Sequence, residues 1–342
     1  MTSAIIPFEQ ASYLTQIIRL RALATDVVKK FPIKVKALTF IRHNANAIFR
    51  VTDTQDKKYC VRIHPVDYNT EEAILEEFKW LNILETTNIP VPKPICIHEQ
   101  KYLVKQTHTG ISGFRYCDML EWLDGKFLWK GINKKYAYNL GVLIAKLQTN
   151  GKNLQVKHRC DYWDADALVG AEKARCKNVD HISDISHEQQ KIITSAKTFA
   201  YEKLKGYQIS YPDKFGLIHG DLNPNNIIIK NNQYGAIDFD DCGTGLYGVD
   251  LATPLIAFEH LAEDQGKNFN ELKEALFLGY SEYMPLMQMD IDMSPYFMLA
   301  LKLHTLGWVE LKKDNPKLRP WILKCTESTI AFFESTKWKD PV

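Results

Sequence analysis

Polar and acidic side chains interrupt a series of short apolar segments between Leu217 and Asp250. Asp221 follows the segment LIHG, Asn226 comes five residues later, and Asp238 lies within AIDF, twelve residues further on. A carboxylate at the end of a buried strand costs free energy unless hydrogen bonds or a cation compensate it. If NIIIK and YGAIDFD form a β-hairpin, the three side chains come together.

Such a group of oxygen-bearing side chains suits a magnesium ion. Mg²⁺ prefers oxygen ligands and keeps several waters, so one carboxylate, one amide oxygen and nucleotide phosphates form a suitable set. A second carboxylate near the metal can accept a hydrogen bond from an attacking hydroxyl. This arrangement is typical of phosphoryl transfer, in which positioning and charge neutralisation supply most of the catalysis.

The same stretch reads H-G-D-L-N-P-N-N, then I-D-F-D, then G-V-D-L-A. In this order the motifs resemble the aminoglycoside phosphotransferase and choline kinase family, which has a protein-kinase-like fold. The resemblance implies that Asp221 is the catalytic base and that Asn226 and Asp238 bind Mg²⁺. We expect His219 to shape the catalytic loop rather than act as a base, and Asp250 to cap a helix or anchor that loop.

Four further positions have open or minor roles. Asp240 and Asp241 are candidates for further metal or substrate contacts, but acidic residues after a strand also serve turns. Asn223 and Gln148 stand where many relatives carry histidine, and neither is expected to carry chemistry.

A kinase-like fold also requires a basic residue on its third strand, paired with an acid on the following helix. Arg62 lies in the apolar segment YCVRI, and a helix is predicted from an N-cap at Asn69 through Leu84. At about 100° per residue, Glu77 falls in the middle of the apolar face of this helix, whereas Glu76 points away. We expect Arg62 to pair with Glu77 and to orient the α and β phosphates of a nucleotide.

Two further segments fit nucleotide binding. RHNANAIFRV, with Asn46 at its tip, stands where the resemblance places the phosphate-covering hairpin, and MLEWLDG stands at the adenine hinge. There the backbone carbonyl near Glu121 and the amide near Leu123 would hold the adenine edge. The hairpin lacks glycine, and Arg62 replaces the usual lysine, with which it is not interchangeable.

The pattern of elements predicts an α+β, bilobal, protein-kinase-like fold. A helical segment and short β-like runs precede the turn at Asp124 and Gly125, so residues 1–124 are predicted to form a nucleotide-binding lobe with a small antiparallel sheet and a helix. Helical patterns at residues 136–149 and 247–333 predict a larger, mostly α-helical lobe over residues 125–342. That lobe would hold the catalytic loop and the acceptor site.

Composition excludes several other classes of protein. The chain has 342 residues and a net charge of +2, too near neutral for a general attraction to nucleic acid or anionic lipid. Its seven cysteines are scattered and never spaced C-x-x-C, which disfavours a disulfide framework or a zinc site. No apolar run approaches the length of a membrane span, so we expect a cytoplasmic protein without a membrane or nucleic-acid partner.

The resemblance therefore implies an ATP- and Mg²⁺-dependent phosphotransferase whose partner is a small-molecule acceptor with a hydroxyl group. Amino alcohols, amino acids, sugars and aminoglycosides are candidate acceptors, and LFLGYSEYMPL resembles the homoserine-kinase-like branch. Three alternatives stay open: a nucleotide-binding regulatory pseudokinase, a protein Ser/Thr kinase of the same fold, and a metal-dependent phosphohydrolase. The sequence does not determine the oligomeric state.

Overall fold

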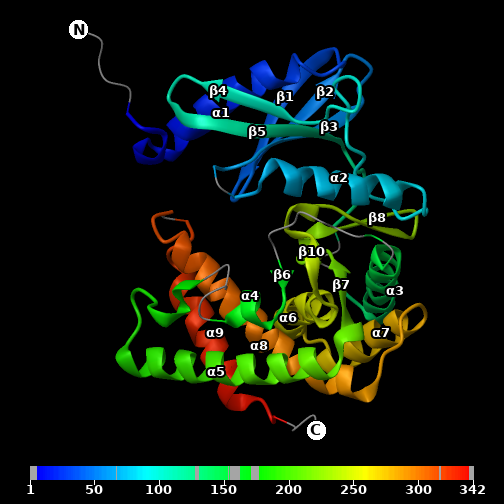
Figure 1. Ribbon diagram of the computed structural model, residues 1–342, viewed down its shortest axis with the longest axis vertical. Coiled ribbons are helices and arrows are strands. Elements are labelled where there is room, and N and C mark those ends of the chain that lie inside the picture. Colours follow the sequence, from blue (N-terminus) through cyan, green and yellow to red (C-terminus); the bar gives the residue numbers. More distant parts are fainter. Residues whose placement is uncertain are drawn as a thin grey trace. The chain divides into compact units, whose positions relative to one another are not determined.

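The computed structural model describes residues 6–66, 68–127, 131–152, 154, 162–170, 177–315 and 317–338 (Figure 1). Contacts within the chain divide it into two compact units, residues 1–125 and 126–342. Each unit has its own strands and helices. Among the residues that the structure describes, no helix is both long and apolar enough to cross a membrane.

Unit 1 is built on a five-stranded antiparallel sheet. In spatial order its strands are β1 (Val35–His43), β2 (Ala47–Asp53), β3 (Lys58–Ile63), β5 (Ile111–Glu121) and β4 (Val104–His108). Helix α1 (Tyr13–Val28) covers one face, where Leu23 and Val61 belong to the same buried apolar cluster. Because side chains alternate along a strand, Arg62 points to the other face, toward α2 (Glu71–Glu85).

The start of α2 differs from the sequence prediction. Thr70 is the N-cap, because its Oγ1 accepts the Ala73 N–H at 3.2 Å, so the prediction of Asn69 as the cap is wrong. Glu77 is buried as expected. Glu76, which we expected to point away from the apolar face, is also buried and forms an ion pair with Lys79.

Unit 2 is mostly helical. Its helices are α3 (Lys134–Gly151), α4 (Ala165–Val169), α5 (His187–Ser210), α6 (Gly248–Gln265), α7 (Phe269–Ser281), α8 (Gln288–Leu311) and α9 (Trp321–Ser335). Three short strands, β6 (Tyr162–Trp163), β10 (Gly243–Leu246) and β7 (Phe215–Ile218), form one sheet in that order. A separate hairpin consists of β8 (Ile227–Lys230) and β9 (Gln233–Ala236). The predicted α+β class, with a small antiparallel sheet and a larger helical part, is confirmed.

The region around the acidic motifs is less extended than expected. YGAIDFD was expected to continue as a strand, but β9 ends at Ala236. Asp238 has a left-handed backbone, with φ 67°, and a short 3-10 turn covers Phe239–Asp241. This reversal ends the strand before the acidic residues, so they lie in a turn rather than along a sheet face.

Candidate active site

The loop between β7 and β8 holds the carboxylate of Asp221 by both oxygens. Asn223 Nδ2 donates to Oδ1 at 2.7 Å, and Asn226 Nδ2 donates to Oδ2 at 2.8 Å and to the backbone oxygen of Asp221 at 2.9 Å. Asn223 itself is fixed, because its Oδ1 accepts the Asn225 N–H at 2.9 Å. Asn223, which was not expected to carry chemistry, thus contacts the predicted base directly.

The β8–β9 hairpin brings Asn226 beside the acidic turn. Ile227 pairs with Ala236, and the Ile237 N–H donates to Asn226 O at 2.9 Å. Asp238 follows directly, and the negative charges of Asp238 and Asp241 both act on Asp221. The structure thus gathers the predicted residues Asp221, Asn226, Asp238 and Asp241 in one place.

The electrostatics of this group favour a cation. Burial, followed by the charges of Asp241 and Asp238, raises the pKa of Asp221 to about 8, although hydrogen bonds from Asn223 and Asn226 oppose this shift. Neighbouring carboxylates resist ionising together unless a positive charge balances them. A divalent ion would provide that charge.

The side chains present supply only some of the oxygen ligands that such an ion needs. Asn226 donates a hydrogen bond to Asp221 through Nδ2. The Oδ1 of the same amide, an oxygen of the type that binds Mg²⁺, is directed away from that bond. The described residues contain no group of three His, Cys, Asp or Glu side chains that could hold a metal by themselves. A set of Asn226 and Asp238 therefore fits Mg²⁺ only if phosphate and water oxygens complete it.

His219 and Asp250 form hydrogen bonds that hold the loop between β7 and β8. A carbonyl oxygen can only accept, so the 3.1 Å contact of His219 Nε2 with Ile237 O assigns the proton to Nε2. Nδ1 then accepts the Asp221 N–H at 3.3 Å. Asp250 accepts the N–H groups of His219 and Gly220 at 3.0 and 2.9 Å. Burial raises the pKa of Asp250 to about 6, against the lowering effect of these bonds.

Gly220 allows the loop to pack tightly. Its φ is 83°, and a Cβ there would lie 2.6 Å from Asp241 O and 3.0 Å from the Trp163 ring. Trp163 Nε1 donates to the same Asp241 oxygen at 2.9 Å. Asp240 is buried, whereas Asp241 is only half-buried. Of the two open candidates, Asp241 is thus the more accessible.

In unit 1 the expected pair of Arg62 and Glu77 is present and buried. Nη1 and Nη2 of Arg62 donate to Oε1 and Oε2 of Glu77 at 2.8 and 3.1 Å. Nε and Nη2 also donate to Asp118 at 2.9 and 3.1 Å, and His64 Nε2 lies 2.7 Å from Asp118 Oδ2. Arg62 is only 2% exposed, so two carboxylates hold it within unit 1.

Sequence reasoning missed Asp118 and His64. The available signal was the acid within the apolar segment FRYCDMLEWL, which needs a buried partner just as Glu77 does. Burial alone would raise the pKa of Asp118, but Arg62 and His64 lower it below the usual value.

The remaining nucleotide-site candidates lie at the edges of the unit 1 strands. Asn46, between β1 and β2, is buried, and its Oδ1 has no hydrogen-bond partner among the described residues. Glu121 ends β5, where its N–H donates to Lys93 O at 2.7 Å. Leu123, two residues later, is half-buried.

Comparison with known proteins gives one family match. The family model described as the phosphotransferase enzyme family (APH) matches residues 37–286. Among curated proteins, a probable bifunctional tRNA threonylcarbamoyladenosine biosynthesis protein from Methanoculleus marisnigri is 32% identical over 101 residues. That match spans 30% of this chain and only 19% of the other protein's length.

The solved structures that are similar over nearly the whole chain include two kinases. A microcompartment-associated aminopropanol kinase has a TM-score of 0.79 and 22% identity, covering 92% of this chain and 96% of that one. Amicoumacin kinase, in complex with AMP-PNP, Ca²⁺ and Ami, has a TM-score of 0.75 and 20% identity, with coverages of 94% and 96%. At such identities, the likeness establishes a common fold.

Proposed function

The chain belongs to the phosphotransferase enzyme family, as its motifs predicted, and on that premise we propose that it transfers the γ-phosphoryl group of ATP to a hydroxyl of a small molecule. The observation that carries this proposal is the group around Asp221. An acid held on both oxygens lies beside Asn226, Asp238 and Asp241. This group has the parts that phosphoryl transfer requires: an acceptor for the hydroxyl proton and oxygen ligands for a metal.

In this proposal Asp221 is the catalytic residue. Its carboxylate would accept a hydrogen bond from the acceptor hydroxyl and receive its proton as the phosphoryl group is transferred. Asn226 and Asp238 would hold Mg²⁺, which supplies charge neutralisation for the phosphates when it is bound. Asn223 and Asn226 keep the Asp221 carboxylate in one orientation.

Unit 1 would bind the nucleotide. Asn46 would lie over the phosphates, and the backbone near Glu121 and Leu123 would hold the adenine edge. Glu77 and Asp118 fix the guanidinium of Arg62, whose positive charge would act on the α and β phosphates. Two carboxylates offset much of that charge, so we expect Arg62 to contribute less to nucleotide affinity than a lysine with one acidic partner.

Small amino alcohols are the first acceptors to test. Both similar structures described above are kinases, and one of them is described as acting on aminopropanol. Asp241, which is half-buried beside Asp221, offers a carboxylate for the ammonium group of such an acceptor. Amino acids, sugars and aminoglycosides are the next classes in the panel.

A nucleotide-binding regulator without turnover is the second candidate. The burial of Arg62 between Glu77 and Asp118 favours it, because phosphates would meet a guanidinium that is already balanced. The arrangement around Asp221 favours the enzyme instead.

Formation of ADP distinguishes the two candidates. The purified chain is incubated with Mg·ATP and 1-amino-2-propanol, other amino alcohols, sugars or aminoglycosides. The enzyme proposal predicts acceptor-dependent ADP formation, reduced at least about a hundredfold in Asp221→Asn. Asp264→Asn, an exposed change in α6, serves as the matched control and keeps wild-type activity. Binding of Mg·ATP without ADP formation across the whole panel would support the regulator.

A further inference from the structure

Two buried side chains outside the candidate active site connect to its loop through Asp250. Gln148, on α3, is fully buried, and Tyr280, on α7, is 3% exposed. The Tyr280 hydroxyl donates to Gln148 Oε1 at 2.6 Å, and Gln148 Nε2 donates to Asp250 Oδ2 at 3.3 Å. Asp250 in turn binds the N–H groups of His219 and Gly220, next to Asp221.

The neighbours of Gln148 leave its amide only one favourable orientation. Its Nε2 faces two acceptors, the Asp250 carboxylate and Tyr247 O, the latter at 3.1 Å. A flipped amide would place Oε1 against both of these oxygens. These two acceptors therefore direct the NH₂ group to Asp250, and the Tyr280 hydroxyl donates to Oε1 on the other side.

The close packing of α3 and α7 fixes the distance between Gln148 and Tyr280. A Cβ on Gly141 would lie 2.0 Å from Leu276 O, and a Cβ on Gly279 would lie 1.9 Å from Tyr138 O. The two helices thus touch through their main chains at both glycines. Such close packing leaves little freedom for the side chains that bridge them.

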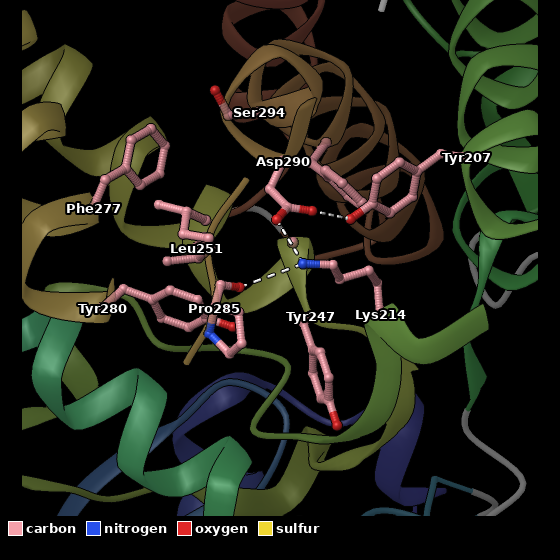
Figure 2. Close-up of a pocket in the computed structure, with 12 residues that line it drawn as sticks. Tyr207, Lys214, Tyr247, Leu251, Phe277, Tyr280, Pro285, Asp290 and Ser294 are labelled. Atoms are coloured by element: carbon pink, nitrogen blue, oxygen red, sulfur yellow. Dashed lines mark hydrogen bonds and ion pairs between the residues drawn. The ribbon is translucent and has the colours of Figure 1, made fainter. Parts of the chain in front are cut away.

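Tyr280 also lines a small pocket of unit 2 (Figure 2). On another side of this pocket, Lys214 and Asp290 form an ion pair at 2.6 Å, and the Tyr207 hydroxyl donates to Asp290 at 2.7 Å. Asp221 does not line the pocket. Tyr207 is therefore a matched tyrosine: it lines the same pocket and donates a similar hydrogen bond, but to Asp290 instead of Gln148.

We propose that Gln148 and Tyr280 are positioning residues, which hold the loop bearing Asp221 in its reactive geometry through Asp250. This inference rests on the proposed function, since the loop is reactive only in a phosphotransferase. Removing the Tyr280 hydroxyl would leave the buried Oε1 of Gln148 without its donor, so the side chain is held from one side only. Its bond to Asp250 then weakens, and the N–H bonds of His219 and Gly220 loosen.

The test compares four variants with the wild type: Tyr280→Phe, Gln148→Met, their double variant and Tyr207→Phe. Amide hydrogen exchange in residues 217–226 is followed in the full chain, and ADP formation gives kcat and KM for Mg·ATP. We expect Tyr280→Phe to exchange faster in residues 217–226 and to lower kcat about three- to tenfold at unchanged KM. The double variant should match Gln148→Met, because the hydroxyl acts only through Gln148.

Tyr207→Phe separates a positioning role from a general loss of stability. It should lower the thermal midpoint as Tyr280→Phe does, but leave kcat and exchange in residues 217–226 at wild-type values. Wild-type exchange in residues 217–226 of Tyr280→Phe, or a wild-type kcat in that variant, would overturn the inference. If the wild type turns over no Mg·ATP with any acceptor, the proposed function fails, and the exchange comparison alone decides whether the network holds the loop.

Discussion

Asp221 depends on its neighbours for both its orientation and its charge. Asn223 and Asn226 each donate to one of its carboxylate oxygens, while Asp241 and Asp238 make its ionisation less favourable. The two amides therefore keep the acid aligned, and its charge depends on whether a cation is nearby.

Asn223→Ala tests the alignment. The change removes one hydrogen bond to Asp221 but leaves the bond from Asn226, so we expect kcat to fall about tenfold with little change in KM for Mg·ATP. Steady-state ADP formation measures both constants. Asn270→Ala, an exposed change at the start of α7, is the control, and equal kcat values for the two variants would contradict the role given to Asn223.

The raised pKa of Asp221 predicts that metal binding depends on pH. With a pKa of about 8, the Asp221 carboxyl is mostly protonated at pH 7, and a nearby cation favours its ionised form. Binding of Mg·AMP-PNP should therefore release protons near pH 7 and grow tighter as pH rises toward 8. Calorimetry in two buffers with different ionisation enthalpies measures this release. Equal proton release in Asp221→Asn would assign it to another group.

Residue types and spacing predicted the acids of unit 2 because one short stretch of chain contains them all. The same reasoning could not find Asp118 for Arg62, or Tyr280 for Gln148, since those partners are 56 and 132 residues apart. A buried polar residue in an apolar run shows that a partner must exist. Only the packing of the elements shows which residue it is.

Three elements of unit 1 meet at one guanidinium. Arg62 on β3 binds Glu77 on α2 and Asp118 on β5, so the helix, the strand and its neighbour share one buried charged group. Removing one member of such a group leaves the others poorly compensated.

Asp118→Asn should lower the free energy of unfolding at pH 7 by about 3 kcal/mol. The pKa of folded Asp118 lies below its ordinary value of 3.8, so its ionised form stabilises the fold above about pH 4. That contribution is lost as pH falls through the folded-state pKa, so the two proteins should converge in acid. Urea unfolding between pH 7 and pH 3 measures the difference. Asp124→Asn, an exposed change, should alter the free energy of unfolding by less than about 0.5 kcal/mol. A similarly small change for Asp118→Asn would contradict the stabilising contact of Asp118 with Arg62.

Thr70→Ala tests where α2 begins. Loss of the hydroxyl that accepts the Ala73 N–H should cost about 1 kcal/mol in urea unfolding. An unchanged unfolding free energy would contradict Thr70 as the N-cap.

Apolar runs predicted β2 and β3 of unit 1 and β8 of unit 2, because these strands bury many of their apolar side chains. The apolar runs could not predict where elements begin or end, because one hydrogen bond or one backbone conformation decides that position. Thr70 rather than Asn69 caps α2, and the left-handed backbone of Asp238 ends the strand expected through residue 240.

For the molecule as a whole, two compact units supply different parts of the proposed reaction. Unit 1 carries the buried group around Arg62, and unit 2 carries Asp221 with the residues proposed to bind Mg²⁺. The family match runs from residue 37 to residue 286 and so includes most of each unit.

Asn226 and Asp238 should bind a divalent ion beside Asp221 when nucleotide is present. Crystals grown with Mn²⁺ and AMP-PNP would locate that ion by its anomalous scattering. We predict one strong peak in contact with Asn226 Oδ1, the Asp238 carboxylate and phosphate oxygens. A nucleotide bound without such a peak, or a peak coordinated by other residues, would show that Asn226 and Asp238 do not form the metal site.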